Sequence, residues 1–127
     1  MAFSGGIERR KGLGVLFRAL RHLEGDHAEV VVDVCGSETQ WRRYGRLVPP
    51  AWQDRVRFHG RLSQTDVAKL LRGADVYCAP SFGPETASVA LLEAMASGAA
   101  VVASRIPGYD EVVRDDVDGL LVPPRDV

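Results

Sequence analysis

Short apolar runs alternate along this chain with stretches in which apolar residues recur at the three- and four-residue spacing of a helix. The runs are rich in Val and Ala, and most of them end at glycine or proline, which is typical of buried strands. The pattern predicts about six strands, at residues 1–4, 29–35, 56–59, 74–79, 99–103 and 120–122.

The helical stretches lie between these runs. Leucines and a phenylalanine at helical spacing predict a first helix over residues 11–23, which should end at Gly25-Asp26. Ser63 is the expected N-cap of a later helix, with Asp66 in the capping-box position, and that helix should end at Gly73. The remaining helices are predicted at residues 39–47, 87–96 and 110–114.

Strands and helices therefore alternate at intervals of roughly 20 to 25 residues. Such a run of βα units predicts an α/β fold with a doubly wound parallel sheet, covered by helices on both faces. Ligands of these sheets bind beyond the carboxyl ends of the strands. Those ends are expected at residues 4–6, 36–37, 60–62 and 80–85, each of which contains Gly or Pro.

Composition narrows the class of protein. With 127 residues, the chain is a single domain, and 46% hydrophobic and 26% charged residues are ordinary for a globular protein. A formal net charge of -1 without blocks of like charge gives no support for nucleic-acid binding. No apolar run has the length of a signal peptide or a membrane span. The chain starts abruptly in a strand, which suggests a fragment of something longer.

The two cysteines and three histidines add little chemistry. Cys35 and Cys78 each follow an apolar run, so both are expected to be buried, reduced thiols, and the compartment to be the cytoplasm. The histidines have no zinc-like spacing with one another or with the cysteines, so no metal site is predicted. A dinucleotide fingerprint, a Walker A sequence and a recognisable catalytic triad are all absent from the sequence.

Two carboxylates, Glu85 and Glu93, stand out in the stretch over residues 80–98. The helix predicted there is apolar almost all round, which indicates burial on most sides and a partner for the Glu93 charge. At 1.5 Å per residue the two positions lie roughly 12 Å apart, about the span from a sugar past a pyrophosphate to a ribose. Phosphates would then lie over the helix N-terminus. On spacing alone, a structural Glu bonded to a backbone amide or an Arg is the more common case.

Arg9, Arg10 and Lys11 lie at the start of the first helix, where basic residues oppose the helix dipole. An anion bound at that terminus would explain them, and so would a solvated run of charges. The residues themselves leave both interpretations open.

The stretch over residues 80–103 resembles the donor-binding signature of the family 4 (group 1) glycosyltransferases, PS-x-x-x-E-x7-E-A-M-A-x-G-x-x-V-V-A. Similarity continues through residues 108–113 and 118–124. Upstream, Arg10-Lys11-Gly12 resembles the basic loop of this family, and residues 56–60 and 74–76 also fit. The resemblance covers nearly the whole chain in the right order.

The resemblance implies a GT-B enzyme with two Rossmann-like domains and an active site between them. Residues 1–127 look like the C-terminal, donor-binding domain, an α/β/α sandwich. The family transfers a sugar from a nucleotide-diphosphate sugar to an acceptor hydroxyl with retention, usually without a metal or other cofactor. The acceptor domain or subunit, and any peripheral membrane association, are expected to belong to parts outside this chain.

The same resemblance assigns roles to individual residues. Glu93 would hold the donor ribose hydroxyls, Glu85 would contact the donor sugar as the catalytic carboxylate, and Lys11 would neutralise the diphosphate. Backbone groups near Arg61 and Leu62 would meet the base. The remaining expected substrate-binding residues are Gly5, Arg10, Ala87, Ser88 and Val89.

Three departures from the family pattern keep alternatives open. Glu85 is followed by Thr-Ala-Ser where the family usually has Ser/Gly-Phe-Gly, Gly5 stands where an Arg is usual, and Asp110 replaces a Pro. A non-catalytic nucleotide-sugar-binding or assembly module is therefore the main rival. A sugar-nucleotide epimerase of related fold is a third reading, against which the E-x7-E-A-M-A sequence argues. The isolated chain is not expected to catalyse efficient transfer.

Overall fold

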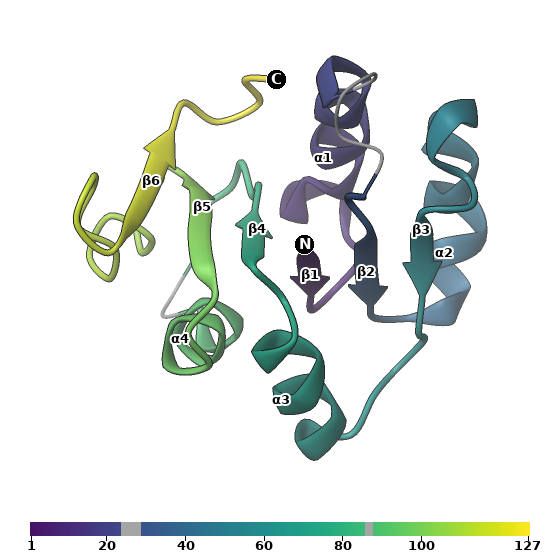
Figure 1. Cartoon of the computed structure of the whole chain (residues 1–127). Helices are drawn as coiled ribbons and strands as arrows, with labels where there is room; N and C mark the ends of the chain where they lie inside the picture. The colour runs from purple at the N-terminus through teal and green to yellow at the C-terminus, as the bar shows by residue number, and fades with distance from the viewer. Residues whose placement is uncertain (24–28, 86–87) are drawn as a thin grey trace.

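A computed structural model of the chain describes residues 1–23, 29–85 and 88–127. They form a six-stranded sheet in the order β3-β2-β1-β4-β5-β6, in which every pair of neighbouring strands is parallel (Figure 1). The predicted parallel α/β sheet is thereby confirmed. The strands are β1 Ala2–Ser4, β2 Val32–Cys35, β3 Val56–Phe58, β4 Val76–Ala79, β5 Ala100–Ser104 and β6 Gly119–Val122.

A strand of only three residues, β1, lies at the centre of the sheet. All three residues of β1 are buried, and the strand pairs with β2 on one side and with β4 on the other. The N-terminal amine extends the ladder by donating to the Val31 carbonyl at 3.0 Å. The register places Ser4 opposite Cys35, so these two side chains end their strands at the same edge.

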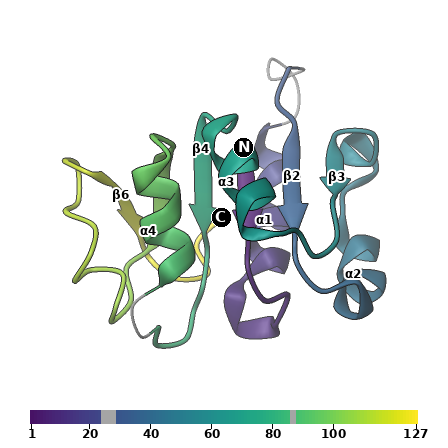
Figure 2. The ribbon, with the colours of Figure 1, turned by 90° about the horizontal axis from the view of Figure 1, so that it is seen from below.

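Helices cover both faces of the sheet (Figure 1, Figure 2). Along β1, Phe3 belongs to the core formed with α1 and α2, whereas Ala2 belongs to the core formed with α3 and α4. The α-helices are α1 Leu13–Ala19, α2 Glu38–Tyr44, α3 Gln64–Arg72 and α4 Val89–Ala96. Short 3-10 helices are η1 Arg9–Lys11, η2 Leu20–Leu23, η3 Gly45–Leu47 and η4 Pro50–Trp52.

Helix boundaries differ from the expected ones for local reasons. The helix expected over residues 11–23 is divided, because Gly12 adopts a left-handed φ of 76° between η1 and α1. Its expected end at Gly25-Asp26 lies outside the described residues. Ser63 caps α3 as predicted, since its hydroxyl accepts from the Asp66 amide at 3.2 Å. Residues 110–114, expected to be helical, lie in hydrogen-bonded turns and loop.

The helix containing Glu93 was expected to be buried on most sides, and that expectation is wrong. Helix α4 begins at Val89, with Ser88 as its N-cap, and only Leu91 and Ala94 are buried within it. Val89 is 64% exposed and Leu92 is 46% exposed. The reason is that α4 packs on the sheet through one stripe only.

Candidate functional site

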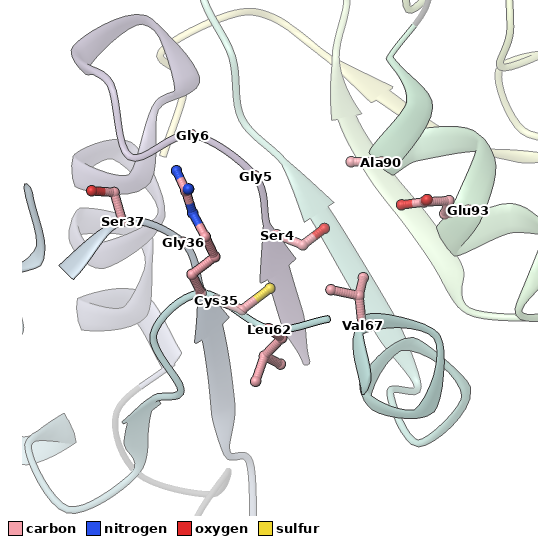
Figure 3. Close-up of a pocket in the computed structure, with 11 residues that line it drawn as sticks. Ser4, Gly5, Gly6, Cys35, Gly36, Ser37, Leu62, Val67, Ala90 and Glu93 are labelled. Atoms are coloured by element: carbon pink, nitrogen blue, oxygen red, sulfur yellow. The ribbon is translucent and has the colours of Figure 1, made fainter. Parts of the chain in front are cut away.

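A cavity of about 280 Å³ opens at the carboxyl edge of the sheet, between the ends of β1 and β2, the segment after β3, and the helices α3 and α4 (Figure 3). Three of the four predicted strand ends line this cavity. Its position agrees with the rule that ligands of parallel sheets bind beyond the carboxyl ends of the strands. The fourth predicted end, residues 80–85, does not line it. The lining residues are Ser4, Gly5, Gly6, Cys35, Gly36, Ser37, Arg61, Leu62, Val67, Ala90 and Glu93.

Glu93 is the acidic residue of this cavity. Figure 3 shows its carboxylate directed from α4 toward the end of β1. Among the described residues it makes no hydrogen bond and no ion pair. A structural Glu in an apolar helix would be expected to have such a partner. The carboxylate is therefore available to a ligand in the cavity.

Cys35 forms part of the cavity wall beside Glu93. Burial raises the pKa of the Cys35 thiol, a hydrogen bond with the Gly5 backbone lowers it, and the negative charge of Glu93 raises it again. The net effect keeps the thiol neutral near pH 7, so it serves as a small apolar surface. Cys35 and Glu93 both line this cavity.

A second cluster joins Glu85 to the basic loop. One Glu85 carboxylate oxygen accepts from Arg10 Nη1 at 2.8 Å, and the other accepts from Lys11 Nζ at 2.8 Å. Arg10 also donates through Nε to Glu8 at 3.0 Å. The Glu85 side chain is only 6% exposed, so both of its bonds are shielded from water. The structure thus brings together three predicted site residues, in a cluster that shares no residue with the Glu93 cavity.

Because Gly12 has no side chain, the basic loop packs closely against the segment that leads to Glu85. A side chain at Gly12 would place its Cβ 1.8 Å from the Pro80 carbonyl oxygen, and the left-handed φ of 76° disfavours any such residue. The Phe82 amide then donates to the Arg10 carbonyl at 2.9 Å. These contacts hold Arg10 and Lys11 against the loop after β4.

Gly108 allows equally close packing at the other end of the same segment. Its φ is 91°, and a Cβ there would lie 1.6 Å from the Glu85 carbonyl oxygen. The Glu85 amide donates to the Pro107 carbonyl at 3.2 Å, and the hydroxyls of Ser81 and Tyr109 lie 3.0 Å apart in a buried hydrogen bond. The turn after β5 therefore fixes the Glu85 backbone.

The whole chain, residues 1–127, matches the profile of the family described as Glycosyl transferases group 1. The chain belongs to this family. A phosphatidyl-myo-inositol mannosyltransferase of Mycobacterium leprae is 39% identical over 122 residues, which are 94% of this chain and 31% of that protein.

Two solved structures share the fold. Sucrose-phosphate synthase from Thermosynechococcus elongatus aligns with a TM-score of 0.86 and 30% identity, over 98% of this chain and 32% of that one. Anabaena HepE in complex with UDP and glucose aligns with a TM-score of 0.85 and 24% identity, over 97% and 34%. This group 1 glycosyltransferase chain therefore has a Rossmann-like fold of the GT-B type, and it spans about a third of the proteins it resembles.

The N-terminus of α4 holds the other predicted contacts of this group 1 chain. Ser88 is buried and its hydroxyl accepts from the Leu91 amide at 3.4 Å, so it acts as a helix cap. Val89 starts the helix and is exposed, and neither residue lines the Glu93 cavity. Ala87 lies outside the described residues. The Leu91 and Leu92 amides of the first turn also donate to the Ser88 carbonyl, at 3.0 and 3.1 Å.

Sequence reasoning missed some of the cavity walls. Cys35 was expected only as a buried thiol, although the pairing of β1 with β2 would have placed it beside Ser4. Val67 and Ala90 fall within predicted helices, and nothing in their spacing distinguishes a cavity wall from core packing.

The described part of the group 1 chain contains neither a candidate metal site nor a candidate membrane-spanning helix. There, no group of three or more His, Cys, Asp and Glu residues is placed to hold a metal ion. His59 instead bonds to Asp33, with Nε2 and Oδ1 separated by 2.6 Å. No helix over these residues is long and apolar enough to cross a membrane.

Proposed function

We propose that this chain is the donor-binding, C-terminal domain of a retaining group 1 glycosyltransferase, which transfers a sugar from a nucleotide-diphosphate sugar to an acceptor hydroxyl. An acceptor domain or subunit outside the chain completes the active site. The observation that carries the proposal is the Glu93 carboxylate, which faces the cavity at the carboxyl edge without a partner among the described residues. The complex of Anabaena HepE with UDP and glucose supports the class of ligand.

The nucleoside end of the donor occupies the 280 Å³ cavity in this proposal. Glu93 accepts hydrogen bonds from the ribose hydroxyls, and bonds to a charged acceptor are the stronger kind. The base lies against the segment of Arg61 and Leu62, which lines the same cavity. Gly5, with a φ of 120° and open space around its Cβ position, allows the backbone to approach the ligand closely.

The diphosphate reaches toward Lys11 and Arg10, and the donor sugar toward Glu85. Both cations are engaged by Glu85 in this structure. When the donor binds, its diphosphate therefore displaces the Glu85 carboxylate from the two cations, so that one anion replaces another. Glu85 is then released to face the sugar. The exchange costs less than stripping the two cations of all partners, because each cation keeps an anionic partner.

The experiment is a calorimetric titration of the 127-residue chain with UDP, GDP and ADP, followed by a transfer assay. Binding of at least one nucleotide, without turnover by the chain alone, is expected because half of the positioning surface is missing. No binding of any of the three nucleotides refutes a donor-binding domain. Turnover by the isolated chain refutes the need for an acceptor domain or subunit.

A non-catalytic nucleotide-sugar-binding module is the second candidate. The tight engagement of Glu85 by Arg10 and Lys11 favours it, since a catalytic carboxylate has to be free to face the sugar. Adding an acceptor domain from a related enzyme separates the two functions. Binding that never becomes turnover after this addition supports the module.

A further inference from the structure

A second hollow, of about 390 Å³, lies on the α1 and α2 side of the molecule and is lined by four arginines. They come from four separate segments: Arg9 from η1, Arg18 from α1, Arg43 from α2 and Arg125 from the segment after β6. The hollow shares no lining residue with the cavity of Glu93. It is therefore not part of the proposed nucleoside site.

These arginines form a cluster of positive charge that no acidic side chain among the described residues neutralises. Among the described residues, no acidic one lines the hollow and none of the four arginines forms an ion pair. Two adjoining hollows are lined by Glu8, which bonds to Arg10 at 3.0 Å, and by Asp126. A chain whose 16 basic and 17 acidic residues nearly balance has no general excess of positive charge to explain this grouping.

Packing around the hollow fixes its walls. The Arg125 guanidinium lies 4.4 Å from the centre of the Phe82 ring, a cation–π contact that holds it at the rim. A Cβ at Gly14 would lie 3.5 Å from Leu47, so the missing side chain lets η3 pack closely on α1. Tyr44 adds a hydroxyl to the lining.

We propose that this hollow binds a phosphate group, carried by a soluble phosphate ester or by the head group of an anionic phospholipid. Guanidinium groups match phosphate oxygens with two parallel hydrogen bonds, and they are more weakly hydrated than an ammonium. Four guanidinium groups around one hollow carry more positive charge than a single carboxylate can neutralise. The proposal does not depend on the donor site, whose cations Arg10 and Lys11 do not line this hollow.

Two probes distinguish the sources of phosphate. The first is calorimetric titration of the 127-residue chain with glycerol 3-phosphate, and the second is co-sedimentation with phosphatidylcholine vesicles that contain phosphatidylglycerol, with pure phosphatidylcholine as the blank. The test variant combines Arg18→Ala with Arg43→Ala. The control combines Arg21→Ala with Arg42→Ala, which removes the same charge from exposed neighbours that do not line the hollow.

The test variant is expected to lose about tenfold or more in affinity, and the control less than about twofold, because only the first loses charge-assisted bonds. Vesicle binding with this pattern assigns the site to a lipid head group, and binding of glycerol 3-phosphate alone assigns it to a soluble ester. Equal losses in both variants, or no binding of either probe by the unmodified chain, overturn the proposal. The UDP titration of the test variant stays unchanged, which separates this result from the donor site.

Discussion

Lys11 Nζ lies 2.8 Å from a carboxylate oxygen of Glu85, whose side chain is almost fully buried. The two residues are 74 positions apart, and Gly12 and Gly108 hold the backbones that bring them together. With Arg10 on its other oxygen, Glu85 engages both cations that the proposed function assigns to the diphosphate. Donor binding and the release of Glu85 are thus expected to be a single event.

Glu85→Gln tests this exchange. The amide keeps the size of the side chain and removes its charge, so Lys11 and Arg10 should become more available to phosphate. We expect UDP affinity to rise about threefold or more at low salt, since bonds to a charged partner are the stronger ones. Affinity for the sugar-bearing donor should rise less or fall, because the contact of Glu85 with the sugar is lost. Calorimetry with both ligands measures the difference.

Glu8→Gln is the matched control, because the Glu8 side chain bonds to Arg10 at an exposed position. It should change UDP affinity by less than about twofold, as expected for a surface pair. A fall in UDP affinity for Glu85→Gln would contradict the exchange and assign Glu85 a purely structural role.

Lys11→Ala tests the phosphate role directly. A lysine ammonium acts on phosphate as a point charge and does little for a base or ribose. We therefore expect UDP affinity to fall about tenfold while uridine affinity stays the same, and parallel titrations compare the two ligands. Lys69→Ala is the control, since this lysine is exposed and bonds to Asp66 on α3. Equal losses for UDP and uridine would remove Lys11 from the phosphate site.

The alternation of short apolar runs with helical spacing was enough to predict the sheet and the segments at its carboxyl edge, three of which line the Glu93 cavity. It could not predict where the fold brings distant residues together. Nothing in the spacing of Arg10 and Lys11 shows that both bond to Glu85, because that contact depends on the turn at Gly108 packing on the Glu85 backbone.

The errors have physical reasons as well. The apolar content of α4 indicated burial all round, yet Val89 and Leu92 face away from the sheet. The apolar composition of a helix in this chain therefore does not predict how many of its sides are buried. The sequence singled out Arg9 of the second hollow but not its grouping with the other three arginines, because the four lie on separate segments that only the fold brings together.

The two glycines that hold the Glu85 segment should be hard to replace. Gly108→Ala would place Cβ 1.6 Å from the Glu85 carbonyl oxygen, and Gly12→Ala 1.8 Å from that of Pro80. Gly98→Ala is the control, because its φ is also left-handed at 83° but nothing lies within 4 Å of the Cβ position. We expect the control to lose about 1 kcal/mol in urea unfolding and the other two clearly more. Equal losses in all three would show that φ alone sets the cost.

Cys78 should make the fold sensitive to alkaline pH. Burial raises the pKa of its thiol from an ordinary value of 9.0 to about 11, so the folded chain favours the neutral form. Stability is therefore complete below about pH 9 and is lost as the pH rises toward 11, by about 2 to 3 kcal/mol in all. Urea unfolding at a series of pH values measures the slope, and Cys78→Ala should make it shallower. An unchanged slope in this variant would rule out Cys78 as the cause.

Glu93→Gln separates a ligand contact from a structural one. Because the Glu93 carboxylate has no hydrogen bond or ion pair among the described residues, the substitution should leave the melting temperature unchanged within about 2 °C. UDP affinity should still fall, by roughly 1 kcal/mol or more, since the ribose hydroxyls lose a charged acceptor. Removing the negative charge should also lower the pKa of Cys35, so iodoacetamide should modify this thiol faster at pH 8 in a Cys78→Ala background. A thermal melt, a titration and an alkylation time course cover the three effects. Early melting with normal UDP affinity would instead make Glu93 a structural residue, and the proposed ribose contact would fail.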